Sequence, residues 1–141
     1  MLAVRVLGRC GGVVSDIADG IRWAAGLSVT NVPNNANPAR VINMSLGGSS
    51  ATCQTAYQDA INDVRNANAV VIVAAGNDSV DAGGQQPANC ADVITVAATT
   101  TTGGRAGFSN FGSVVDISAP GVDIRSTMNG STTACNNTHT Y

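Results

Sequence analysis

An asparagine follows a strand-like run in this chain, and its side chain is suited to stabilising negative charge. Residues 70–75 read Val-Val-Ile-Val-Ala-Ala, a run typical of a parallel strand covered on both faces, and Gly76 and Asn77 follow directly. Ligand sites of open α/β sheets lie beyond the carboxyl ends of such strands. An amide donor fixed there would stabilise a developing oxyanion, and it does not titrate. The residues alone leave a simpler alternative open, a strand that ends in an asparagine turn.

Two other segments combine small residues with the end of a predicted strand. Ser45, Leu46 and Gly47 follow the strand predicted at residues 40–44, and their backbone groups are accessible enough to pair with an extended peptide. Gly11 and Gly12 form a turn before a predicted helix, but the surrounding residues match neither a dinucleotide-binding nor a P-loop motif. A glycine turn without any ligand remains the alternative for the segment at Gly47.

Strands and helices alternate along the chain and would position these segments. Strands are predicted at residues 3–7, 40–44, 69–74 and 93–97, with shorter ones at 114–118 and 124–128. One helix is expected to begin at Ser15 and a second at Ser50 or Thr52, because these side chains are good N-caps. Their apolar stripes are Ile17, Ile21, Ala24 and Ala25, and Ala56, Ala60, Ile61 and Val64. The pattern predicts an α/β fold with parallel crossovers.

The composition limits the classes of protein to which the chain can belong. The 141 residues correspond to one domain, of which 44% are hydrophobic and only 11% charged. The net charge of −2 gives no electrostatic support for nucleic-acid binding, and no apolar run approaches the length of a membrane span. Because a predicted core strand begins almost at Met1, we expect the chain to be a fragment of a longer protein.

The four cysteines favour disulfide bonds over metal binding. Cys10, Cys53, Cys90 and Cys135 form no CxxC pair and have no histidine at ligand spacing, so zinc is not expected. An even number of cysteines in a chain this poor in charge favours disulfides and an oxidising compartment. Four buried free thiols are the alternative.

Three motifs in order resemble those of the subtilisin-like serine proteases, the subtilases. They are Asn43-Met44-Ser45-Leu46-Gly47-Gly48, then Ala74-Ala75-Gly76-Asn77, then Phe108-Ser109-Asn110-Phe111-Gly112 continuing to Ser118-Ala119-Pro120-Gly121. The resemblance covers essentially the whole chain. It implies an α/β three-layer sandwich with a mostly parallel central sheet, truncated at both ends. Residues 1–141 would then be part of a subtilase catalytic domain.

The resemblance implies a role for each of these segments. Asn77 matches the side-chain donor of the oxyanion hole, and the residues that match the substrate-binding segments are Gly11, Gly12, Val13, Ser45, Leu46, Gly47, Ala74, Ala75 and Gly76. The implied reaction is hydrolysis of polypeptides by acyl transfer, which needs no cofactor. The triad Asp and His would precede Met1 and the nucleophilic Ser would follow Tyr141, so the isolated fragment is expected to be inactive. His139, the single histidine, is out of order for the base.

The resemblance also implies a structural calcium ion, held by Asp116 and by carbonyl groups near Ala91 and Val93. The alternative is an Asp116 carboxylate that accepts hydrogen bonds from backbone N–H groups.

Cys53 and Cys90 are expected to form a disulfide. Cys53 lies where the second helix begins and Cys90 lies just before the fourth strand, so both would fall on one side of the sheet. We expect a secreted, extracellular monomer that binds neither nucleic acid nor membranes. Two other functions stay open: a non-catalytic, protease-like peptide-binding protein, and a dinucleotide-binding α/β domain, although the fingerprint of the latter is missing.

Overall fold

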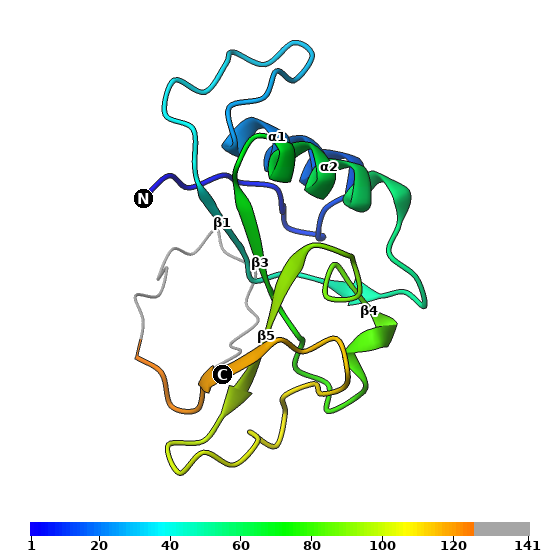
Figure 1. Ribbon diagram of the computed structural model, residues 1–141, viewed down its shortest axis with the longest axis vertical. Coiled ribbons are helices and arrows are strands. Elements are labelled where there is room, and N and C mark those ends of the chain that lie inside the picture. The colour runs from blue at the N-terminus through cyan, green and yellow to red at the C-terminus, as the bar shows by residue number, and fades with distance from the viewer. Residues whose placement is uncertain (126–141) are drawn as a thin grey trace.

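The computed structural model describes residues 1–125, and a four-stranded sheet forms its centre (Figure 1). The strands lie in the order β1 (Val41–Met44), β3 (Val70–Ala74), β5 (Val93–Thr99) and β6 (Ile117–Pro120). Every neighbouring pair is parallel. The predicted α/β fold with a mostly parallel sheet is therefore confirmed.

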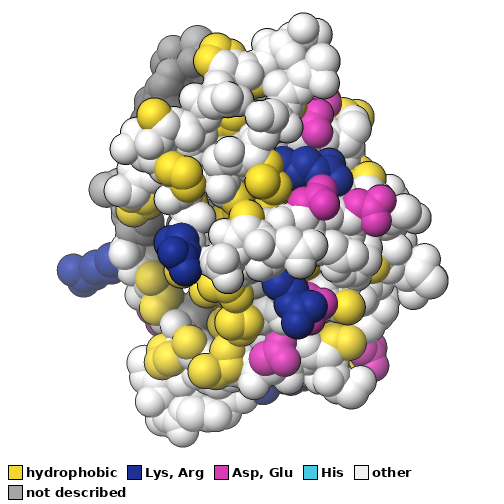
Figure 2. All heavy atoms as spheres, turned by 45° about the horizontal axis from the view of Figure 1, so that its top comes forward, with side chains coloured by type: hydrophobic (Ala, Val, Ile, Leu, Met, Phe, Trp, Pro, Cys, Tyr) yellow, Lys and Arg dark blue, Asp and Glu magenta, His cyan; other side chains and the backbone are white. Residues whose placement is uncertain are grey.

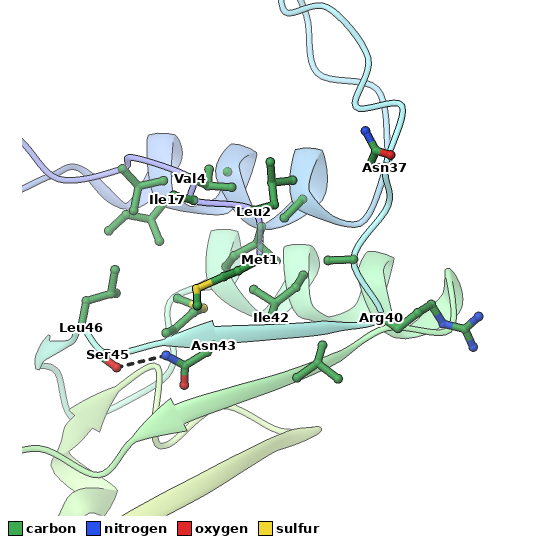
Figure 3. Close-up of a pocket in the computed structure, with 18 residues that line it drawn as sticks. Met1, Leu2, Val4, Ile17, Asn37, Arg40, Ile42, Asn43, Ser45 and Leu46 are labelled. Atoms are coloured by element: carbon green, nitrogen blue, oxygen red, sulfur yellow. Dashed lines mark hydrogen bonds between the residues drawn. The ribbon is translucent and has the colours of Figure 1, made fainter. Parts of the chain in front are cut away.

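Two helices, α1 (Val14–Ala24) and α2 (Thr55–Asn66), lie side by side on one face of this sheet (Figure 3). Their contact includes an ion pair in which Arg22 Nε lies 2.7 Å from Asp63 Oδ2. The buried helix residues are Ile17, Ala18, Ile21 and Ala24 in α1, and Tyr57, Ala60, Ile61 and Val64 in α2. The predicted stripes are thus correct except at Ala56, which is exposed while Tyr57 is buried in its place. Burial raises the pKa of the Tyr57 phenol.

Both helices begin a few residues away from their predicted N-caps. The cap positions are Val13 and Gln54, which have extended backbone and make no side-chain capping bond. The Ser15 hydroxyl contacts Asp16 Oδ1, and the Ser50 hydroxyl donates to the carbonyl of Thr52. The hydroxyls of Ser15 and Ser50 therefore contact polar groups within two residues of their own position and do not cap a helix. Serine side chains commonly form such local bonds in place of a cap.

The predicted strand at residues 3–7 is wrong. No ladder forms there, and β1 is the edge of the sheet among the described residues. A cavity of about 840 Å³ separates residues 1–6 from β1, and Met1, Leu2 and Val4 line it (Figure 3). Val6 instead packs against Gly20 of α1 and the core. An extended segment becomes a strand only where a partner offers backbone groups, and no segment of residues 1–125 pairs with this one.

Near the C-terminus, the strand predicted at residues 114–118 begins later, as β6. The strand predicted at 124–128 is absent at Ile124 and Arg125, and its remainder lies outside the described residues, as do His139 and Cys135.

The connection between β3 and β5 contains a short 3-10 helix, η1 (Ala82–Gly84), and the strand β4 (Gln85–Gln86). β4 pairs antiparallel with β2 (Gly48–Ser49), which follows β1. Asn89 joins the same two segments, since its Nδ2 donates to the carbonyls of Ser50 at 2.9 Å and Gly83 at 3.1 Å. The polar loop at residues 78–90 is therefore fixed against the segment that follows β1.

The two faces of the sheet differ in how they are covered. On the helix side, Val71, Val73 and Ala97 are no more than 6% exposed. The strand register places Val41, Ile94 and Ile117 on the opposite face, where their exposed fractions are 57%, 37% and 58%. The sequence predicted a β3 covered on both faces, and the described residues cover it with helices on one.

The surface carries both signs of charge. Arginine and aspartate side chains lie near one another on the face drawn in Figure 2, with hydrophobic patches between them. Among residues 1–125 no helix is long and apolar enough to span a bilayer.

Candidate active site

A cleft of about 390 Å³ lies at the carboxyl ends of the parallel strands. Its lining combines the ends of four strands: Asn43 of β1 with Ser45 after it, residues 72–77 of β3 and its continuation, residues 96–98 of β5, and Ala119 and Pro120 of β6 with Gly121 after them. The structure thus brings five predicted site residues together, namely Ser45, Ala74, Ala75, Gly76 and Asn77. This is the edge at which open α/β sheets bind ligands.

Asn77 presents an exposed amide at this cleft. Its side chain is exposed, and it makes no hydrogen bond to any other residue in the described part of the chain. The backbone before it is fixed: Ala75 is 1% exposed, and its N–H donates to the carbonyl of Val96 at 2.9 Å. Asn77 therefore stands directly after a rigid strand end, and no residue of 1–125 competes with a ligand for its side-chain amide.

Gly76 provides the turn between the strand and Asn77. Its φ is +108°, a conformation that residues with a Cβ rarely adopt. A Cβ at this position would also meet the side chain of Asn110. Glycine is thus required here by the backbone and by a close neighbour.

That neighbour, Asn110, had no role in the sequence analysis although it lies in one of the motifs. It is completely buried, and its carboxamide binds backbone groups on both sides of Asn77. The signal in the sequence was weak, because nothing in Ser109-Asn110-Phe111-Gly112 shows that the Asn110 side chain binds residues 30 to 35 positions away.

Ser45, Leu46 and Gly47 continue from the end of β1. The Ser45 hydroxyl accepts a hydrogen bond of 3.2 Å from Asn43 Nδ2 (Figure 3). A Cβ on Gly47 would lie 2.8 Å from the carbonyl oxygen of Gln86. The glycine therefore also permits the close approach of β4, a reason that sequence analysis did not provide.

Gly11, Gly12 and Val13 do not line this cleft. Gly8 and Gly11 form a tight turn, in which the Gly8 N–H donates to the Gly11 carbonyl at 2.8 Å. Val13 caps α1 with extended backbone and is 59% exposed. Pairing of this segment with a substrate stays a prediction.

Comparison with known proteins identifies the family. Residues 1–141 match the sequence profile of the subtilase family, peptidase S8, over their whole length. The chain belongs to the subtilase family. It is 56% identical, over 94% of its length, to an extracellular protease of Xanthomonas campestris pv. campestris, and 48% identical, over 91%, to an extracellular basic protease of Dichelobacter nodosus. The dinucleotide-binding alternative is therefore wrong.

A solved structure supports the same assignment. The chain superimposes on a protease from Pseudoalteromonas arctica with a TM-score of 0.81 and 55% sequence identity, over 83% of this chain. This subtilase chain spans 34% of that structure, and 23% and 21% of the Xanthomonas and Dichelobacter proteins.

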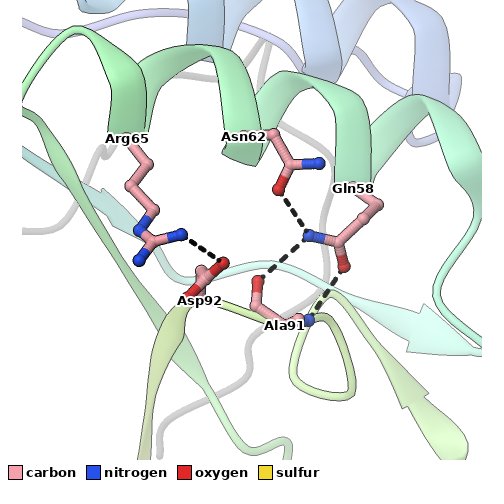
Figure 4. A network of polar contacts seen from close by, with 5 residues as sticks. All are labelled: Gln58, Asn62, Arg65, Ala91 and Asp92. Atoms are coloured by element: carbon pink, nitrogen blue, oxygen red, sulfur yellow. Dashed lines mark hydrogen bonds and ion pairs between the residues drawn. The ribbon is translucent and has the colours of Figure 1, made fainter.

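The residues predicted to hold calcium have other partners in this subtilase chain. Asp116 Oδ2 accepts a 2.7 Å hydrogen bond from the Thr95 N–H, which is the alternative that the sequence left open. The Ala91 carbonyl accepts a bond of 3.2 Å from Gln58 Nε2, and the Ala91 N–H donates to Gln58 Oε1 (Figure 4). Among residues 1–125, no three His, Cys, Asp or Glu side chains cluster as metal ligands. Asp116 keeps one carboxylate oxygen, Oδ1, without a hydrogen bond from residues 1–125, and a calcium ion held by Asp116, Ala91 and Val93 stays a prediction.

The structure contains the predicted disulfide between Cys53 and Cys90, whose Cα atoms lie 4.9 Å apart. It joins the segment before α2 to the end of the loop at residues 78–90. Gln86 reinforces this link, since its Oε1 accepts a 3.2 Å bond from the Gln54 N–H. Cys10 is exposed and forms no disulfide with any cysteine of residues 1–125.

Proposed function

We propose that this chain is the oxyanion and substrate-binding part of a secreted serine endopeptidase. One observation carries the proposal: the exposed Asn77 amide stands unpaired among the described residues, on a fixed backbone, in the cleft at the carboxyl ends of the sheet. The longer protein that would contain residues 1–141, called the parent protein below, would supply the catalytic Asp, His and Ser. Secretion is supported by relatives that are named extracellular proteases.

In this mechanism the chain stabilises charge and holds the substrate. The serine attacks the scissile carbonyl while the histidine takes its proton, and the carbonyl oxygen becomes negative. Asn77 Nδ2 donates a hydrogen bond to that oxygen, which lowers the energy of the tetrahedral intermediate. The backbone of Ser45, Leu46 and Gly47 would pair with the extended polypeptide on its acyl side. This chemistry needs no cofactor.

The uncovered face of the sheet supports the proposal that the parent domain is larger. Parallel sheets are stable when both faces are covered. Val41, Ile94 and Ile117 are exposed on the face opposite the helices, and no described helix packs there. The rest of the parent protein would cover this face and complete a three-layer sandwich.

Inhibition of the parent protein tests the proposed function. We expect the purified parent to hydrolyse unfolded casein, and phenylmethylsulfonyl fluoride to abolish this activity, because the reagent sulfonylates an activated serine. A thiol-directed reagent serves as the control, and it should not inhibit because the proposed chemistry uses no thiolate nucleophile. A parent that binds unfolded polypeptide without cleaving it would instead establish the non-catalytic peptide-binding alternative.

We also propose a structural calcium ion at Asp116. Oδ1 of this residue accepts no hydrogen bond from residues 1–125 and would serve as the carboxylate ligand, with the Ala91 and Val93 carbonyls completing the set. At a calcium concentration of about 100 Kd, the parent should gain about 2.7 kcal/mol of stability, seen as a higher Tm. Asp116→Asn keeps an acceptor for the Thr95 N–H but removes the charge, so it should abolish this gain. An equal rise of Tm in both proteins would refute the site.

A further inference from the structure

Asn110 braces the backbone on both sides of Asn77. Its Nδ2 donates to the carbonyl of Ala75 at 2.9 Å, just before Asn77. Its Oδ1 accepts from the N–H groups of Asp78 at 2.9 Å and Val80 at 3.1 Å, just after it. A fourth bond joins the Asn110 N–H to the carbonyl of Gly76 at 3.0 Å. The side chain of Asn110 and its backbone N–H together therefore bind residues on both sides of the proposed oxyanion residue, Asn77.

The brace is itself anchored to the sheet. The neighbouring Ser109 is 1% exposed, and its hydroxyl accepts a 2.9 Å bond from the N–H of Ala98 in β5 and donates to the Asn110 carbonyl. Arg105 Nη1 donates to the Ser109 carbonyl and, at 3.0 Å, to the Ser79 hydroxyl. Movement of Asn110 would break several of these bonds together, so its position is well fixed.

The fit between Gly76 and Asn110 shows that the contact is close. Because Gly76 has no Cβ, the Asn110 carboxamide can lie directly against the turn. The turn has a positive φ at Gly76 and is followed by exposed residues 77–80, so little packing holds it otherwise. Asn110 binds the residues directly before and after Asn77, whereas the other bonds of this turn lie further along it: the Ser79 N–H donates to the Phe108 carbonyl at 2.9 Å and the Val80 carbonyl accepts from the Phe111 N–H at 3.1 Å.

We infer that Asn110 is a positioning residue that aims the Asn77 amide at the developing oxyanion. Stabilisation by a hydrogen-bond donor depends on a geometry fixed in advance, and small displacements are costly in rate. Asn110 does not touch the substrate and acts through the backbone of Asn77. The inference rests on the proposed function.

The test uses the parent protein with Asn110→Ala, assayed on a peptide p-nitroanilide. We expect kcat to fall about 10- to 100-fold and KM to change less than about twofold. Rates are referred to the active-site concentration from titration with a serine-directed inhibitor, so unfolded molecules are not counted. Asn110→Ser, which keeps a hydroxyl, should lose less and is the variant to use if alanine prevents folding.

Asn35→Ala is the matched control. Asn35 is also buried and makes three hydrogen bonds to backbone groups, those of Trp23, Ala24 and Asn37. It lies in the connection between α1 and the start of β1, whereas the cleft lies at the carboxyl ends of the strands. The control variant should lose stability as Asn110→Ala does, and kcat per active site should stay at the wild-type value. A similar fall of kcat in both variants would mean that Asn110 acts only through general stability.

Coupling to Asn77 provides the decisive measurement. If Asn110 acts through Asn77, then Asn110→Ala should lower kcat less than about twofold in a protein that already carries Asn77→Ala. Full additivity of the two losses would overturn the inference, and so would an unchanged kcat in Asn110→Ala alone. An inactive wild-type parent would overturn the proposed function and this inference with it. In an active parent whose kcat depends on Asn77, the proposed function stands, and the Asn110 variants then test this inference separately.

Discussion

Replacing Asn77 with alanine in the parent protein is expected to lower kcat about 10²–10³-fold while KM changes less than about twofold. The magnitude is the one known for the oxyanion asparagine of subtilisin, a member of this family, and is not calculated from this structure. We expect kcat to fall and KM to change little because the amide hydrogen-bonds a negative charge that exists only in the transition state. The bound substrate does not carry this charge, so its binding loses little.

An exposed asparagine outside the cleft provides the control for this prediction. Asn62 lies on the outer surface of α2, where its Oδ1 accepts a hydrogen bond of 3.1 Å from Gln58 (Figure 4). Asn62→Ala should leave both kinetic constants unchanged. Kinetics on a peptide p-nitroanilide at constant active-site concentration measure both variants. A wild-type kcat in Asn77→Ala would show that the assigned oxyanion residue is wrong.

The regular parts of the fold could be predicted because each depends on a local pattern. The stripe of Ile17, Ile21 and Ala24 and the β-branched run before Asn77 are local burial patterns, and α1 and β3 form where these patterns occur. The predicted strand at residues 3–7 fails for the opposite reason. A strand needs a partner, and the alternation Val4-Arg5-Val6 contains no information on whether one is adjacent.

The candidate site could be predicted only where its residues follow one another in sequence. Ala74 to Asn77 form a contiguous motif at a strand end, so their place at the cleft follows from the strand itself. Asn110 belongs to the site through contacts that span 30 to 35 residues. Hydrogen bonds of this kind leave no periodicity in the sequence, and only the folded chain reveals them. The same holds for the approach of Gln86 to Gly47.

The Cys53–Cys90 disulfide is expected to have the largest effect of any single bond on the stability of the parent protein. It closes a loop of 37 residues, for which the chain-entropy model gives a stabilisation of about 4 kcal/mol. The bond also holds the loop at residues 78–90 against the segment before α2, where Asn89 and Gln86 add hydrogen bonds. Its removal should therefore loosen the two-stranded sheet that β2 and β4 form together.

Three variants measure this effect and contain their own control: Cys53→Ala, Cys90→Ala and the double variant. Each should lower the free energy of unfolding by about 4 kcal/mol, measured by urea titration of enzyme inactivated with phenylmethylsulfonyl fluoride, so that self-digestion does not contribute. The double variant should lose no more than either single variant, because the first substitution already breaks the bond. Additive losses would show two independent thiols, and wild-type stability in all three variants would show that the bond contributes nothing.

In active enzyme the same three variants should raise KM more than they lower kcat. The loosened β2–β4 pair lies beside Gly47, which would bind the substrate, while Asn110 still holds Asn77.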